Sequence, residues 1–445
     1  MPLPTTFAGV SVRGQGGFTY AVQNVYKFTD WQSTSNTAFT PKLLTIDSSG
    51  NMYFATQDIS GYLWKVNSSF VVQWTIQRNA AIFDAAVDNT NNTITIIDGS
   101  YVTNLSMSNG SVNWQYQVRT SLYSVTLKKI TSDLSGNFWV TYGQLTRSGS
   151  ARFGYTYTQA ANGYAKINST GVTIINEYSP AINGIASSTS GTIIIVGSDS
   201  SGPFVNAPAI AGGYMASADS NYSTFSSSNP FSVCIDSAGT YCYVPFRNAA
   251  GGGMYYDSLI MKGSISSSLG SAFQPAISFL SPTVIPYITD ICMDPSNNIY
   301  VLFWEGLTGY YYLAKINSSL TLQWCNQITD GNNASVNNIK YHPTLGIIIS
   351  GNEYQSGSTT LRDTFILNVP TDGSHNGHSS AINVNNITIK YFSISGSLYS
   401  SLPSAGKGIG ASGGLGSTTA TAYFSAASVG VSSPSFTDTF TSVPV

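Results

Sequence analysis

The sequence predicts an all-β fold: a seven-bladed β-propeller with a short N-terminal extension and a Gly/Ser-rich C-terminal arm. Two patterns that recur along the chain, and an unusual composition, lead to this prediction. Each pattern marks a polar turn between two short apolar segments, which is typical of paired β-strands. Two such hairpins give four strands per repeat, and four-stranded repeats of about 40–50 residues are typical of propeller blades.

The first pattern is an apolar segment that runs into Asp-x-x-Gly, after which a second apolar segment begins. In its first copy, residues 43–54, the turn contains Asp47 and Gly50. Asp at the start of such a turn can accept backbone N–H bonds, and Gly or Asn near its end tolerates a positive φ. The seven copies, two of them degenerate, begin their turns at Asp47, Asp88, Asp133, Ser188, Asp236, Asp294 and His342. We therefore interpret the five aspartates as structural turn residues.

The second pattern lies about 20 residues further along the repeat and, like the first, is a polar turn between two short apolar segments. Asn67-Ser68-Ser69 separates two apolar segments, and related turns begin at Asn168 and Asn317. A fourth copy contains Asn109-Gly110. Together the two patterns supply the four strands of one blade.

Charged residues make up only 9% of the chain, compared with about 25% in an average soluble protein, and the formal net charge is −2. Hydroxyl and amide groups therefore cover much of the surface. Such a chain has no basic field for a phosphate backbone, so we exclude nucleic acid as a partner. We also expect no membrane span and no secretory signal, because no apolar run of about 18 residues and no basic N-terminal region followed by an apolar one is present.

The four cysteines do not follow the spacing of a metal site. Cys234 and Cys242 flank the turn at Asp236, where paired strands would bring them near each other. We expect these two residues, and Cys292 and Cys325, to be buried free thiols.

We divide the chain into three parts: the extension at 1–40, the propeller at 41–396 and the arm at 397–445. The expected blades occupy about 41–78, 79–119, 120–179, 180–228, 229–278, 279–330 and 331–396. The third blade carries an insertion at 145–163, and residues 387–394 suit the outer strand of the seventh. The role of residues 1–40 is left open.

The arm is rich in Gly, Ser, Ala and Thr and has no periodicity. It is either a flexible linker or a segment that becomes ordered against a neighbour in an assembly. In the second case its apolar anchors are Tyr423, Phe424, Phe436 and Phe440.

Residues 94–118 resemble the repeat of quinoprotein-like propellers, in which a Trp just beyond a Gly-containing turn packs between blades. Trp74, Trp114 and Trp324 match that position, so the resemblance implies that they pack between neighbouring blades. The Gly-His and Trp-Asp signatures of WD repeats are absent from the sequence.

Residues 365–374, Phe-Ile-Leu-Asn-Val-Pro-Thr-Asp-Gly-Ser, resemble the Lys-Ile-Pro-Thr-Asp-Gly-Ser segment that closes the propeller of many tailed-bacteriophage virion proteins. Asn368 replaces the Lys of that segment. In those proteins the segment precedes a Ser/Thr/Ala-rich tail with repeated Thr-Asp pairs, and Thr437-Asp438 matches one pair. The resemblance implies a structural protein of a phage tail or fibre that is present in the virion in multiple copies.

Residues suited to catalysis are few. His342 stands in a degenerate turn, where we expect a structural role, and His375 and His378 are too few to bind a metal on their own. No pair of carboxylates is placed for glycoside hydrolysis. We therefore predict no catalytic residues, no metal and no cofactor.

The favoured hypothesis is a bacteriophage virion protein, a propeller component of the tail or of a fibre. It would contact other virion proteins and could touch host-surface glycans through Tyr-rich loops, because aromatic rings stack on sugars. The alternatives are a carbohydrate-binding propeller (a lectin or adhesin) and a quinoprotein-like enzyme. The enzyme would need several charged groups that converge on the central channel.

Overall fold

The computed structural model describes the propeller strands, their tight turns and short segments near both ends of the chain. The described residues are 25–28, 41–56, 61–78, 80–99, 101–119, 124–150, 154–178, 181–188, 190–199, 202–207, 210–214, 232–247, 257–265, 274–280, 286–305, 311–328, 334–354, 361–373, 382–384, 387–389, 423–426 and 440–443. Within these residues every regular element is a β-strand. No helix among them is long and apolar enough to cross a membrane.

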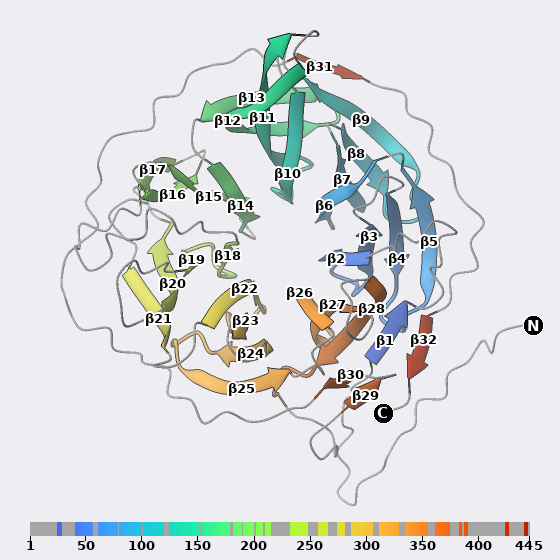
Figure 1. Ribbon diagram of the computed structural model, residues 1–445, viewed down its shortest axis with the longest axis vertical. Helices are drawn as coiled ribbons and strands as arrows, with labels where there is room; N and C mark the ends of the chain where they lie inside the picture. The colour runs from blue at the N-terminus through green and yellow to red at the C-terminus, as the bar shows by residue number, and fades with distance from the viewer. Residues whose placement is uncertain are drawn as a thin grey trace, which may run out of the picture.

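Seven sheets surround a common axis, which confirms the predicted seven-bladed propeller (Figure 1). Each of blades 1 to 6 is built from four strands that follow one another in the chain, and blade 2 carries β31 (Tyr423–Ala426) as a fifth strand on its outer edge. Blade 1 contains β2 (Pro41–Ile46), β3 (Met52–Thr56), β4 (Tyr62–Val66) and β5 (Val72–Gln77). Blade 2 contains β6 (Ile82–Asp88), β7 (Thr93–Asp98), β8 (Tyr101–Ser106) and β9 (Val112–Arg119). Blade 3 contains β10 (Ser124–Ser132), β11 (Phe138–Ser150), β12 (Gly154–Asn168) and β13 (Gly171–Tyr178). Blade 4 contains β14 (Ala181–Ser187), β15 (Ile193–Asp199), β16 (Gly202–Ala207) and β17 (Ile210–Tyr214). Blade 5 contains β18 (Cys234–Ile235), β19 (Tyr241–Arg247), β20 (Asp257–Ser264) and β21 (Gln274–Leu280). Blade 6 contains β22 (Pro286–Met293), β23 (Ile299–Glu305), β24 (Tyr311–Ile316) and β25 (Leu322–Ile328).

Blade 7 closes the ring with strands from both ends of the chain. Its sheet has the order β26 (Ala334–His342), β27 (Gly346–Tyr354), β28 (Leu361–Val369), β1 (Val25–Phe28) and β32 (Phe440–Val443). The expectation that residues 387–394 form its outer strand is wrong. β30 (Ile387–Ile389) instead pairs with β29 (Ile382–Val384), because β1 already occupies the edge of β28.

Two strands of the C-terminal arm pair with blade edges. β31 (Tyr423–Ala426) runs antiparallel to the outer strand β9 of blade 2, and β32 runs antiparallel to β1. Three of the expected anchors, Tyr423, Phe424 and Phe440, lie in these two strands, whereas Phe436 lies outside the described residues. Whether the propeller folds without the arm stays a prediction.

The alternating direction of the strands gives the ring two different faces. The turns between strands 1 and 2 and between strands 3 and 4 of each blade meet at one face, which we call the turn face; both repeated patterns lie there. The connections between strands 2 and 3, and those between blades, meet at the opposite face, the loop face. Their length varies from residues 179–180 to residues 215–233. The insertion predicted at 145–163 is an extension of the β11–β12 hairpin, which stays paired as far as Ser150 and Gly154.

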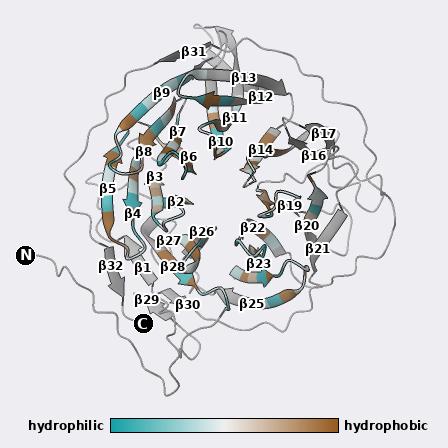
Figure 2. Ribbon diagram, turned by 180° about the vertical axis from the view of Figure 1, so that it is seen from behind, coloured by the Kyte–Doolittle hydropathy of each residue, from teal (hydrophilic) through white to brown (hydrophobic). Residues whose placement is uncertain are grey.

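Among the described residues the core is divided into seven hydrophobic clusters, and each joins two neighbouring blades. Between blades 1 and 2, for example, Tyr53 and Leu63 pack with Ile94 and Leu105, and all four are fully buried. Burial of one large apolar side chain contributes roughly 1.5–3 kcal/mol, so each seam stabilises the ring substantially. Figure 2 shows hydrophobic and hydrophilic residues alternating along strands such as β5 and β9.

Candidate functional site on the propeller axis

The aspartates of the first pattern bind the backbone of their own turns. In blade 1, Asp47 accepts hydrogen bonds from the backbone N–H groups of Ser49 at 3.0 Å and Asn51 at 2.8 Å. Its other oxygen accepts bonds from the Asn51 side-chain amide at 2.8 Å and the Tyr53 hydroxyl at 3.1 Å. Asp294 of blade 6 binds its turn in the same way, including a 3.1 Å bond from Tyr300. A carboxylate used in this way stabilises the turn, because each orphan N–H finds an acceptor.

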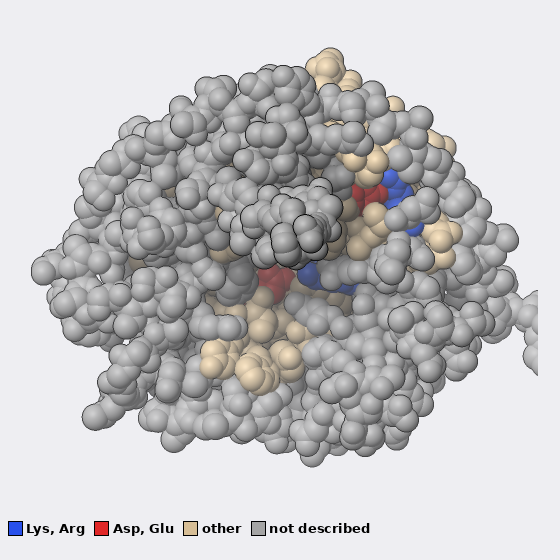
Figure 3. Space-filling model, turned by 45° about the horizontal axis from the view of Figure 1, so that its top comes forward, with Lys and Arg blue, Asp and Glu red and all other residues tan. Residues whose placement is uncertain are grey.

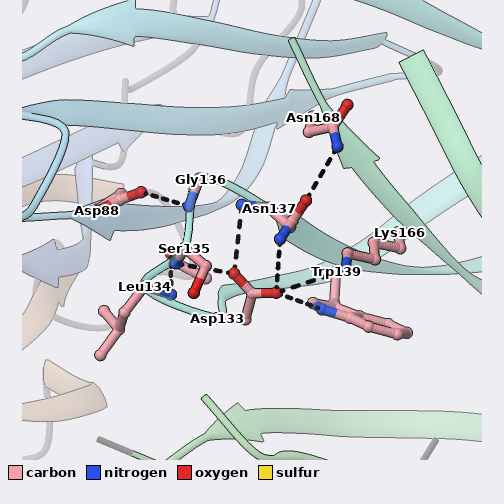
Figure 4. A network of polar contacts seen from close by, with 10 residues as sticks. Asp88, Asp133, Leu134, Ser135, Gly136, Asn137, Trp139, Lys166 and Asn168 are labelled. Carbon is pink, nitrogen blue, oxygen red and sulfur yellow. Dashed lines mark hydrogen bonds and ion pairs between the residues drawn. The ribbon is translucent and has the colours of Figure 1, made fainter. Parts of the chain in front are cut away.

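Asp133 shows how such a turn connects to its surroundings (Figure 4). One carboxylate oxygen accepts bonds from the N–H groups of Ser135 and Asn137, at 2.9 and 3.3 Å. The other accepts a 2.9 Å bond from the Asn137 amide and lies 3.9 Å from the ammonium group of Lys166. The N–H of Gly136 reaches across to the neighbouring blade and donates to Asp88 at 3.1 Å. The turn is thus tied both to itself and to blade 2.

Similar bonds connect other turns around the turn face. Ser48 of blade 1 donates its N–H to the Asn89 side chain of blade 2 at 3.0 Å. Ser237 of blade 5 donates to the Asn297 side chain of blade 6 at 2.7 Å. These contacts connect the turns of blades 1 and 2, 2 and 3, and 5 and 6, which helps to fix the angle between those neighbouring blades.

His342 takes the place of the turn aspartate in blade 7. Its Nδ1 accepts bonds from the N–H groups of Thr344 at 3.1 Å and Leu345 at 3.0 Å, so the ring proton is on Nε2, which donates to the carbonyl of Gly50 at 2.9 Å. Gly50 has a φ of 79°, and a Cβ there would lie only 2.7 Å from the His342 ring. Burial lowers the pKa of His342, although the bond to Gly50 and the charge of Asp47 act in the opposite direction. This histidine therefore joins blade 7 to blade 1 in its neutral form.

A lysine and a tryptophan of one blade bind the second turn of the next blade at two seams. Lys65 and Trp74 donate to the carbonyl of Met107, at 2.8 and 3.1 Å. Lys315 and Trp324 donate in the same way to the carbonyl of Thr371, at 2.9 and 3.2 Å.

The third tryptophan of the pattern, Trp114, packs on the cluster between blades 2 and 3. All three tryptophans are half-buried, against clusters that each span two blades. At the seam of Trp114 it is the Tyr116 hydroxyl that reaches the next blade, where it donates to the carbonyl of Ser169 at 2.9 Å.

Deeper in the ring, polar side chains of the inner strands bind the inner strand of the next blade. Asp84 of β6 accepts a 3.2 Å bond from the N–H of Ile130 in β10. Asp290 of β22 accepts a 3.0 Å bond from the N–H of Ile339 in β26. Ser232 of blade 5 in turn donates to Asp290 at 3.4 Å. We call this set of inner-strand contacts the inner ring.

Three lysines share the inner ring with these aspartates. Lys42, Lys129 and Lys340 lie on β2, β10 and β26 and are half-buried. Burial lowers the pKa of Lys42, and the positive charge of Lys129 lowers it further. Burial acts to lower the pKa of Lys340 too, but the carboxylates of Asp290 and Asp84 outweigh it and raise this pKa. In the space-filling view, acidic and basic side chains lie next to one another in a recess near the middle of the molecule (Figure 3).

A different ion pair is buried on the loop face between blades 1 and 2. Arg78 Nε lies 2.5 Å from Asp98 Oδ2, and both side chains are 2% exposed. Within the described part of the chain Asp98 Oδ1 has no hydrogen-bond partner. Burial raises the pKa of Asp98 to about 6, although the charge of Arg78 acts to lower it.

The four cysteines are free thiols, two of them buried and two half-buried. Burial raises the pKa of Cys242 and of Cys325 to about 12, which makes these thiols poor nucleophiles at neutral pH. No group of three or more His, Cys, Asp or Glu side chains suited to a metal occurs in the described ranges. His375 and His378 lie outside those ranges.

Sequence reasoning identified the turn aspartates but missed the inner ring. A signal was present: Asp84 and Asp290 each stand four residues before a turn aspartate, Asp88 and Asp294, inside an apolar strand. A repeated charge at such a position is unexpected in a chain with so few charges.

The comparisons with known proteins support the fold. No family model and no curated protein sequence matches this chain. Among solved structures, the chain is similar to the β-propeller domain of Myceliophteria thermophila Cps50 (Swd1), with a TM-score of 0.50 and 9% sequence identity. The similarity covers 75% of this chain and 97% of that domain. At this identity the likeness shows the β-propeller architecture alone.

Proposed function

We propose that this β-propeller is a structural protein of a bacteriophage particle, a component of the tail or of a fibre, with no enzymatic activity. Its propeller would be the rigid body, and its C-terminal arm would contact other virion proteins. The protein would assemble in the host cytoplasm and be present in the particle in multiple copies.

The observation that carries the structural role is the use of the carboxylates. Asp47, Asp133 and Asp294 bind the N–H groups of their own turns. Asp84 and Asp290 bind the N–H groups of the next blade. Such bonds favour a scaffold, whereas a hydrolase needs carboxylates that point at a substrate.

The pairing of the arm supports the assembly role. β31 adds a strand to the edge of blade 2, and β32 adds one to β1. Adding a strand to an exposed sheet edge is a common mode of protein recognition, because the edge offers unpaired N–H and C=O groups. The same strands would be suited to the edges of a neighbouring molecule.

The segment that resembles phage virion proteins stands where the propeller proper ends. Residues 370–373 follow β28 directly and form a tight turn, with a 2.9 Å bond from the N–H of Gly373 to the carbonyl of Pro370. Trp324 of blade 6 lies against this turn, since a Cβ on Gly373 would be 2.6 Å from its ring. The segment therefore anchors the last blade before the arm begins.

The experiment compares full-length protein with a variant that ends at residue 396, both supplied to phage from which the native copy has been deleted. We expect purified particles to contain the full-length protein, by mass spectrometry, and to lack the shorter one. The shorter protein should still show a cooperative unfolding transition, because β26, β27, β28 and β1 remain. Particles that lack the full-length protein, or that contain both forms equally, would refute the proposal.

Contact with a host-surface glycan is the part of the proposal that concerns the loop face. Tyr287 and Trp304 stack at the loop-face end of blade 6, with ring centroids 5.4 Å apart and an angle of 22° between the planes. Aromatic faces of this kind stack on sugar rings. Replacement of Trp304 by Ala should weaken adsorption of the phage to its host, whereas Trp114→Ala on the turn face should not. Equal adsorption of both variants would refute this contact.

A further inference from the structure

The inner ring contains lysine ammonium groups that take no part in the hydrogen bonds and ion pairs of the described part of the fold. None of the ammonium groups of Lys42, Lys129 and Lys340 makes a hydrogen bond or ion pair with the protein among the described residues. The two aspartates there, in contrast, bind backbone N–H groups of the next blade. Three positive and two negative charges leave one net positive charge in a partly solvent-exposed ring.

These charges are not spread evenly around the axis. They occur in consecutive blades in the order Asp290 (blade 6), Lys340 (blade 7), Lys42 (blade 1), Asp84 (blade 2) and Lys129 (blade 3). Blades 4 and 5 have uncharged residues at the positions of Asp84 and Asp290.

Those residues are Gly184 and Ser232, which are small, and a Cβ on Gly184 would already lie 3.4 Å from the Ser232 backbone. A charged arc therefore faces an arc of small residues across the propeller axis.

We propose that Lys42, Lys129 and Lys340 bind a small hydroxylated monocarboxylate, such as a sugar acid, on the propeller axis. This proposal goes beyond the proposed function and does not depend on it. The site belongs to the isolated propeller and would exist whether or not the protein enters a particle.

The mutual repulsion of the lysines supports the choice of an anion. The positive charge of Lys129 is among the causes that lower the pKa of Lys42, after burial itself, so the two groups lie close enough to repel each other. An anion between them would relieve this repulsion and favour the charged form of both lysines.

The number of charges decides between a monoanion and a dianion. One net positive charge is matched by one carboxylate, whereas a second negative charge would be repelled by Asp84 and Asp290. An ionised carboxylate has about four lone-pair sites. Asp84 accepts one bond, from Ile130, and Asp290 accepts three, from Ile339, Ile291 and Ser232, so both carboxylates keep acceptor capacity. The remaining sites can accept hydrogen bonds from hydroxyl groups, which is why a hydroxylated ligand fits better than a plain fatty or aromatic acid.

The test is isothermal titration calorimetry on the full-length protein at pH 7, with glucuronate, glucose and inorganic phosphate as probes. We expect glucuronate to bind, glucose not to bind because it lacks the carboxylate, and phosphate to bind at least tenfold more weakly. The affinity for glucuronate should fall as sodium chloride is raised, because salt screens partly exposed charges. No heat with glucuronate at millimolar concentrations, or tighter binding of phosphate, would overturn the proposal.

Variants then locate the site. Lys340→Gln and Lys129→Gln should each weaken glucuronate binding at least tenfold, and two separate variants guard against one that fails to fold. The matched control is Lys262→Gln on β20, a lysine whose ammonium group lies over the Tyr241 ring at 4.0 Å and outside the inner ring. The control should bind glucuronate as the unmodified protein does. Unchanged binding in both inner-ring variants, with cooperative unfolding intact, would show that the ligand binds elsewhere.

Discussion

The two faces of the propeller stabilise a buried carboxylate in different ways. On the turn face Asp47 is 3% exposed and accepts bonds from N–H groups, an amide and a hydroxyl of its own hairpin. On the loop face Asp98 is 1% exposed and depends on Arg78, which comes from the connection between blades 1 and 2. The hydrogen-bond donors to Asp47 belong to its own hairpin, whereas the charge that stabilises Asp98 comes from Arg78, 20 residues earlier in the chain. Stability on the loop face should therefore rest on fewer and more critical groups.

The largest expected effect is at the buried ion pair. Arg78→Ala leaves the Asp98 carboxylate without its partner, which should lower the free energy of unfolding by about 3–5 kcal/mol. The double variant Arg78→Ala/Asp98→Ala should recover part of this loss, because the isolated charge is then gone. Urea unfolding of the two variants measures both values. A loss of unfolding free energy below about 1 kcal/mol for Arg78→Ala would contradict the view that the loop face depends on this ion pair.

A matched pair of tryptophans tests the same contrast in packing. Trp324→Ala on the turn face removes a ring that packs on the seam between blades 6 and 7 and donates to Thr371. We expect a loss of about 3 kcal/mol from the cavity and the lost bond. Trp304→Ala removes a half-buried ring stacked on Tyr287 near the loop face, and should cost about 1 kcal/mol. Thermal unfolding followed by calorimetry compares the two variants, and equal costs would contradict the expectation.

The turn aspartates should be less sensitive, because several donors share each carboxylate. Asp47→Ala should cost about 2 kcal/mol, since buried N–H groups lose their acceptor. Asp47→Asn keeps one acceptor oxygen and should cost about half as much. Guanidinium unfolding of both variants gives the two numbers. A larger loss for Asn than for Ala would mean that the negative charge matters more than the acceptor.

The two faces should also respond to pH in opposite directions. The pKa of Asp98 is raised to about 6 by burial, so its contribution to stability is full below its unfolded pKa of about 4 and is lost as pH rises through 6. The pKa of His342 is lowered by burial, so its contribution is full above its unfolded pKa of about 6.5 and is lost as pH falls below that value. Each slope is at most about 1.4 kcal/mol per pH unit.

Single variants separate the two groups. Between pH 4 and 6.5 the unmodified protein should gain stability relative to Asp98→Asn as pH falls, and should lose stability relative to His342→Asn. Denaturant midpoints at four or five pH values provide the measurement. Parallel curves for all three proteins would show that neither group changes its protonation on folding.

The smallest effect should come from the exposed part of the turn face. Lys166 lies 3.9 Å from Asp133, and its side chain is 26% exposed, so solvent screens the pair (Figure 4). Lys166→Gln should change the free energy of unfolding by less than about 0.5 kcal/mol. Lys315→Gln removes the lysine that donates to the carbonyl of Thr371 and should cost more, about 1 kcal/mol. Thermal midpoints of the two variants rank them, and a reversed order would show that the exposed pair matters more than the bond between blades.

Much of the fold could be predicted from the sequence because both turns are local. Asp47 and the residues that it binds lie within six positions of each other, so a repeated motif records the whole contact. The inner ring joins strands that are far apart in the sequence: Asp84 binds the N–H of Ile130, and any residue other than proline supplies that group. A sequence motif therefore cannot reveal which distant backbone N–H group Asp84 binds.

The same limit applies to the closure of blade 7. Its fourth strand, β1, carries no repeated pattern, and a segment that followed β28 in the chain was the simpler sequence-based choice.

The position of β1 has a consequence for how the protein is made. Val25 pairs with Leu367, so β1 leaves the ribosome well before its partner strand β28, and more than 300 further residues must be synthesised before the two can pair. At about 5–20 residues per second this delay lasts roughly 20–70 s. During that time six complete blades can form, while both edges of the β1 segment remain without their final partners. A protein or slowly folding tag fused to the N-terminus would interfere with the pairing of β1. Such a fusion should therefore lower the yield of closed propellers more than the same insertion in a loop of a middle blade would.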